Sequence, residues 1–174
     1  MPDAAPAPTE RPNALLLVAC FDALLAVLAI LIALAPFGGA IDVGGKVIPL
    51  PLVIQVLLGL DGGLYAACVI TVMVTLTRHD RWVRRTQIAV LALPIAVLVL
   101  SAVLEELLHH DLTGGQLLAS LLVVLVDALI IFAMTGHRVV AWYHRPVPAP
   151  TWVRVTVGLF AAFSVAATVI GQVA

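Results

Sequence analysis

The feature that most constrains this chain is a short polar segment, rich in arginine, between two long apolar runs. The segment covers residues 77–85, and its four arginines are Arg78, Arg81, Arg84 and Arg85. A guanidinium group at the bilayer centre costs about 2.5–3.5 kcal/mol on insertion scales, so we expect this segment to lie outside the hydrocarbon core. Loops of this kind favour the cytoplasmic side. The segment therefore predicts a membrane protein and its orientation.

The composition of the chain also indicates a membrane protein. Hydrophobic residues make up 63% and charged residues 11% of the 174 residues, and the mean hydropathy is +1.15. Soluble domains have about 25% charged residues. The longest polar segment between apolar runs, 36–51, has 16 residues, whereas an independent domain needs roughly 50. These values exclude a soluble catalytic domain and leave too little basic surface for nucleic-acid binding.

Five apolar runs predict an all-α bundle of five transmembrane helices, which forms a single unit over 14–173. A helix rises about 1.5 Å per residue, so each run is long enough for a hydrocarbon core of about 30 Å. The expected spans are 14–35, 52–76, 86–108, 116–136 and 153–173. Residues 1–13 contain four prolines and few apolar groups, which predicts a disordered cytoplasmic tail. A four-span alternative lays the last run flat on the membrane, but residues 155–173 carry no charge and favour a span.

The basic residues agree with this layout. If the N-terminus is cytoplasmic, all eight arginines fall on the cytoplasmic side and only Lys46 falls outside. This asymmetry is what the positive-inside rule requires. We therefore expect a multi-pass protein of the cytoplasmic membrane with an external C-terminus. The candidates for contact with anionic phospholipid headgroups are Arg78, Arg81, Arg84 and Arg85.

Two glycine-rich stretches leave local alternatives open. In the external segment 36–51, Gly44 and Gly45 lie between two short β-prone stretches, which favours a β-hairpin, although a flexible loop fits the same residues. In the second run, three glycines surround Asp61. This aspartate either caps a shorter helix or marks a bend. In the last run, small residues recur every four positions, which favours close packing on a neighbouring helix, although a chance stripe in an alanine-rich helix fits the same residues; they are Gly158, Ala162 and Ala166.

Three acidic residues lie inside the predicted spans: Asp22, Asp61 and Asp127. Counted from the expected span ends, they lie about 12–17 Å from the inner face, with no Lys, Arg or His at that depth. Each must therefore be protonated, hydrogen-bonded, or in contact with water or a cation. One interpretation is a site that handles protons or cations. The other is that each carboxyl is a hydrogen-bonded structural group, and for Asp61 a capping group.

A second polar cluster ends the third run. It consists of Glu105, Glu106, His109 and His110, and glutamate and histidine four positions apart share one face of a helix. The spacing of Glu106 and His109 also occurs in di-metal carboxylate bundles, but matching ligands on other helices are not visible. These residues are weak candidates for a metal site. A solvated helix end explains them more simply.

No motif indicates a specific activity, catalytic residue or cofactor. Cys20 and Cys68 lie inside apolar runs, which disfavours a loop disulfide. The interpretation that fits best is a non-enzymatic accessory, regulatory or immunity-type membrane subunit, which packs on itself or on a membrane-protein partner. The first alternative is a small transporter coupled to protons or cations through the midplane aspartates. The second is a membrane-embedded enzyme that acts on a lipid-like substrate.

Overall fold

Long apolar helices make up most of this computed structural model, which describes residues 11–43, 46–49, 51–107 and 114–173, without the side chains of 40–48, 105–107, 114–120 and 170–173. The helices are α1 (Asn13–Leu34), α2 (Leu52–Thr75), α3 (Arg81–Leu107), α4 (Gly114–Thr135), α5 (His137–Trp142) and α6 (Thr151–Val173). Among the described residues, α1, α2, α3 and α6 are long and apolar enough to cross a membrane, and α4 adds the shorter apolar stretch Leu121–Thr135. The fold is therefore a bundle of apolar helices, which indicates a membrane protein.

The helix ends agree with the expected spans to within two residues, except at the start of α3. The sequence analysis placed Arg81, Arg84 and Arg85 in a polar loop, and this was wrong, because they form the first turns of α3. Arginine is a good helix former. A guanidinium group is costly only inside hydrocarbon. The arginines therefore predict which residues lie outside the hydrocarbon core, but they do not predict where a helix begins.

Helix α1 packs along α2. The side of α1 that is buried is a stripe with a spacing of three or four residues, made of Leu15, Val18, Asp22, Ala26 and Ala29. On α2, a Cβ atom added at Gly62 would lie 2.8 Å from the Cα atom and 2.9 Å from the nitrogen of Ala33. Glycine is therefore required there by the close approach of the two backbones.

The glycine-rich stretch does not interrupt α2. Helix α2 is continuous from Leu52 to Thr75, and Asp61 is its tenth residue. The alternative in which Asp61 caps a shorter helix was therefore wrong. Close packing against α1 explains one of the glycines around Asp61, since Gly62 is buried.

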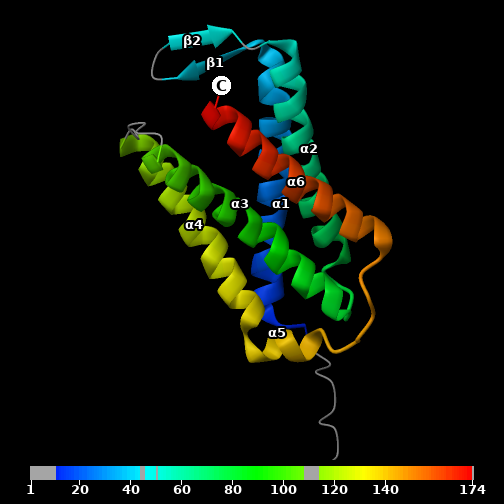
Figure 1. Cartoon of the computed structure of the whole chain (residues 1–174). Helices are drawn as coiled ribbons and strands as arrows, with labels where there is room; N and C mark the ends of the chain where they lie inside the picture. Colours follow the sequence, from blue (N-terminus) through cyan, green and yellow to red (C-terminus); the bar gives the residue numbers. More distant parts are fainter. Residues whose placement is uncertain (1–10, 44–45, 50, 108–113, 174) are drawn as a thin grey trace, which may run out of the picture.

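Helix α6 packs against α2 and α3, and α3 also packs along α4 (Figure 1). The buried residues of α6 include Phe160 and Ser164. By contrast, Gly158, Ala162 and Ala166 are exposed, and a Cβ atom on Gly158 would meet nothing within 4 Å. The prediction that these small residues pack on a neighbouring helix was therefore wrong within the described part of this chain.

Strands β1 (Ala40–Val43) and β2 (Lys46–Pro49) pair antiparallel near the end of α1 and the start of α2 (Figure 1). The register sets Val43 opposite Lys46. Residues 44–45, where a hairpin would turn, lie outside the described residues. The turn itself therefore stays a prediction.

Helix α5 lies at the end of the bundle opposite β1 and β2 (Figure 1). The segments that meet near it, 11–13, 76–85 and 136–154, contain all eight arginines, and we call them the basic end. Here the loop between α2 and α3 is joined to the segment after α5. The Arg81 N–H donates to the Arg145 carbonyl over 2.9 Å, and the Arg145 N–H donates to the His79 carbonyl over 3.0 Å.

A buried tyrosine strengthens this connection. The Tyr143 hydroxyl donates to the carbonyl oxygen of Leu76, the last residue before the α2–α3 loop, over 2.9 Å. Burial raises the pKa of Tyr143, so its hydroxyl stays a hydrogen-bond donor at neutral pH. The short helix α5 is thereby held across the ends of α2 and α3.

The close approach at Gly62 can be tested with a neighbouring control. We expect Gly62→Ala to lower the free energy of unfolding by about 1–3 kcal/mol, because the new methyl group would overlap the α1 backbone. Gly63→Ala should be neutral or stabilising by up to about 1 kcal/mol, since nothing lies within 4 Å of its Cβ position. Denaturant titration of both variants in micelles measures the difference, and equal stabilities would contradict the packing.

Candidate functional site

Asp22 is buried between α1 and α3, where it contacts a glutamine. Asp22 is 1% exposed and Gln87, on α3, is 2% exposed. The Gln87 Nε2 atom donates to Asp22 Oδ1 over 2.7 Å. Within the described residues, Asp22 Oδ2 and Gln87 Oε1 have no hydrogen-bond partner. If Asp22 is protonated on Oδ2, this atom becomes a hydrogen-bond donor, and Gln87 Oε1 is an acceptor. The pair is a buried polar contact that joins two apolar helices.

Asp127, on α4, is also enclosed and is 2% exposed. The shared depth of Asp22 and Asp127 in the bundle stays a prediction. Neither aspartate lines any of the three pockets described below.

Asp61 has a different environment. It is half-buried, and the Ser164 hydroxyl of α6 donates to its Oδ1 atom over 2.7 Å. Both residues line a pocket of about 550 Å³. Side chains from α1, α2, α3, α4 and α6 form its walls, which are mainly apolar. Asp61 is therefore the acid of the three that faces an open space.

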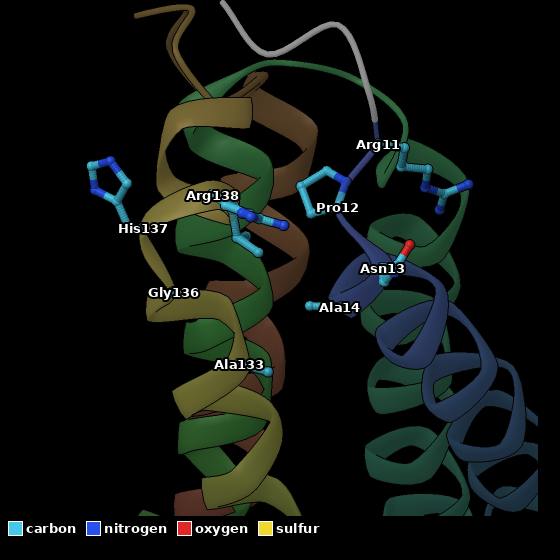
Figure 2. A pocket seen from close by; sticks show the side chains of 9 residues that line it. Arg11, Pro12, Asn13, Ala14, Ala133, Gly136, His137 and Arg138 are labelled. Atoms are coloured by element: carbon cyan, nitrogen blue, oxygen red, sulfur yellow. The ribbon is translucent and has the colours of Figure 1, made fainter.

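Two further pockets lie at the basic end. One, of about 630 Å³, lies between the start of α1 and the junction of α4 and α5, and it includes Arg11, His137 and Arg138 in its lining. Figure 2 shows that Arg138 points towards α1, whereas His137 points away from it. The other pocket, of about 320 Å³, is lined by Arg81 and Arg85 together with the connector after α5. Both pockets present guanidinium groups.

The four arginines that were predicted to contact anionic lipid are all at the basic end. Arg78, Arg81 and Arg85 are exposed and Arg84 is half-buried. Their contact with lipid headgroups stays a prediction. The pocket next to α1 adds Arg11 and Arg138, which the sequence analysis used only to assign orientation.

The predicted Glu/His cluster lies outside the side chains that the structure describes. His109 and His110 lie outside the described residues, and only the backbone of Glu105 and Glu106, in α3, is described. Among the side chains that are described, no three His, Cys, Asp or Glu residues are grouped to hold a metal ion.

The sequence analysis missed Gln87 and Ser164, the partners of two of the acids. Both are uncharged polar residues inside predicted spans. A polar side chain in an apolar run needs a hydrogen-bond partner even when it has no charge, so these residues were a usable signal. What the sequence did not provide was the pairing. Gln87 and Ser164 are 65 and 103 positions away from the aspartates that they contact.

The contact between Asp22 and Gln87 predicts a specific pattern of stabilities. We expect Gln87→Leu to cost about 1–2 kcal/mol, because Asp22 Oδ1 loses its donor while it remains buried. The double variant Asp22→Leu with Gln87→Leu should recover most of this loss, since both polar groups are removed together. Denaturant titration in micelles, followed by circular dichroism, measures the four stabilities. Strictly additive losses would contradict the contact.

Compared with protein-family models, curated protein sequences and solved structures, the chain has no significant match to any of them. Its function therefore has to be inferred from its own side chains. Two arrangements are available for that purpose: the enclosed pair Asp22 and Gln87, and the open pocket at Asp61.

Proposed function

We propose that the protein is a non-enzymatic accessory subunit of the cytoplasmic membrane, with five spans and a cytoplasmic N-terminus. The observation that carries this proposal is the enclosure of Asp22 and Asp127. A carboxyl group that loads and releases protons or cations needs access to water, and these two groups are 1% and 2% exposed and line none of the three pockets. Enclosed acids favour a structural role over the transporter alternative.

The distribution of charge supports the proposed orientation. All eight arginines are in the segments of the basic end, and these segments include both ends of the α2–α3 loop and the whole of α5. A membrane that placed this end outside would oppose the positive-inside rule. Five spans follow if α4 crosses the membrane alongside α3, against which it packs.

Contact with anionic lipid is part of the proposed role. In the proposed orientation the two arginine-lined pockets at the basic end would face the headgroups of the inner leaflet. Each basic side chain near an anionic surface adds about 1 kcal/mol of attraction. The basic end would hold the bundle at a defined depth in the membrane, whatever partner the protein has.

The orientation can be tested by labelling with a membrane-impermeant maleimide. We expect Thr77→Cys to react in inside-out vesicles but not in intact cells, and Pro49→Cys to react in intact cells. Both changes are made in a Cys20→Ala, Cys68→Ala background, because the Cys20 side chain is exposed on α1. That background without an added cysteine is the control and should stay unlabelled. Labelling of Thr77→Cys in intact cells would overturn the proposed orientation.

The structural role of the acids can be tested in proteoliposomes with an imposed pH gradient. We expect wild-type protein, Asp22→Asn and Asp127→Asn to give the proton leak of protein-free liposomes, because an enclosed carboxyl does not exchange protons with either side. A pH-sensitive dye trapped inside reports the leak. A wild-type leak that either substitution abolishes would support the transporter alternative instead.

A further inference from the structure

The pocket at Asp61 combines a carboxyl group with apolar and aromatic walls. We propose that it binds a membrane-soluble organic cation, an amine or quaternary ammonium with an apolar body, for which Asp61 is the counter-ion. This proposal does not depend on the accessory role, because the acids that support that role, Asp22 and Asp127, are not in the lining.

The first argument is charge. A carboxylate that is removed from water needs a positive partner or several hydrogen bonds. Ser164 donates one hydrogen bond to Asp61 Oδ1, which leaves the other oxygen as an acceptor. No Lys, Arg or His is among the residues that line this pocket. A cationic ligand would supply the charge that the described lining lacks.

The second argument is the pair of aromatic rings in the same lining. The rings of Tyr65 and Phe160 stack with centroids 5.2 Å apart and planes at 27°, and both residues line the pocket. Each ring covers one face of the other, and an aromatic face that remains free attracts ammonium groups, most strongly where water is excluded. An acid next to aromatic rings is therefore a better fit for an organic cation than for a neutral or anionic molecule.

The third argument is size and access. A volume of about 550 Å³ is within the usual range for small-molecule sites. Asp61 lies roughly 14 Å along α2 from its first residue, deep within the helix. Two residues of the lining, Ile32 and Val123, are 51% and 45% exposed on the outside of the bundle. The pocket therefore reaches the lipid-facing surface, and its ligand would enter from the bilayer.

Other occupants fit less well. A lipid acyl chain would match the apolar walls but would leave the Asp61 carboxylate without a positive partner. A Ca²⁺ or Mg²⁺ ion would need about six oxygen ligands. The side chains that line the pocket supply five oxygen atoms, two from Asp61 and one each from Tyr65, Ser164 and Thr168, and Asp61 is the one carboxylate among them.

The test compares two probes of the same shape that differ in charge. The full-length protein is placed in nanodiscs of zwitterionic lipid, and the binding of benzyltrimethylammonium and of its neutral carbon isostere, neopentylbenzene, is measured by equilibrium dialysis. We expect saturable binding of the cation and at least tenfold weaker binding of the isostere. Asp61→Asn should weaken cation binding at least tenfold, and Phe160→Leu should weaken it about threefold to tenfold.

Asp80→Asn is the matched control, because it makes the same chemical change outside the pocket, and it should change cation binding less than twofold. Thermal unfolding in the nanodiscs checks that each variant is folded, and Phe160→Leu keeps the test valid if Asp61→Asn does not fold. Equal binding of both probes, cation binding that survives in folded Asp61→Asn, or no saturable cation binding by folded wild-type protein would each overturn the proposal. None of these results bears on the orientation or on the enclosure of Asp22.

Discussion

A carboxyl group inside a bundle of apolar helices is costly to bury without a polar partner, and two contacts that meet this cost join helices in the interior of the protein. Removal of a carboxylate from water costs several kcal/mol unless hydrogen bonds or an opposite charge offset the loss. Asp22 has the Gln87 amide and Asp61 has the Ser164 hydroxyl. The bundle therefore contains specific contacts between helices, whereas apolar packing alone would permit many arrangements in lipid.

The two partnered acids have different consequences. The pair of Asp22 and Gln87 joins α1 to α3 and is enclosed, so its effect is on the arrangement of the helices. Asp61 and Ser164 join α2 to α6 but face a pocket, so the same kind of contact leaves a carboxylate oxygen available to a ligand. Burial, more than the residue type, separates a structural acid from a candidate binding acid here.

Much of the architecture follows from the sequence, because the bilayer restricts what an apolar chain can do. The apolar runs predicted the helices to within two residues at most ends, and the shared depth of Asp22 and Asp127 stays a prediction. The start of α3 was missed because arginine is unfavourable in hydrocarbon but favourable in a helix, so the helix extends beyond the apolar run. The partners Gln87 and Ser164 were missed because contacts between distant positions depend on helix rotation and tilt. These cannot be read from a single sequence.

Helix faces were also only partly predictable. The stripe of Gly158, Ala162 and Ala166 has the spacing of a packing face, yet α6 turns its other side, with Phe160 and Ser164, towards the bundle. In this orientation Ser164 donates a hydrogen bond to Asp61 and Phe160 stacks on Tyr65. Small residues permit close packing, but these two contacts form only when that side of α6 faces the bundle.

The most direct test of this account is solid-state NMR of the protein in lipid bilayers, with labelled aspartate carboxyl carbons and glutamine side-chain nitrogens. The account predicts a through-space correlation between the Asp22 carboxyl carbon and the Gln87 Nε2 nitrogen, and no transfer of magnetisation from water to Asp22. A missing correlation, together with a carboxyl group of Asp22 that is in contact with water, would contradict the enclosed polar contact on which the proposed arrangement of the bundle depends.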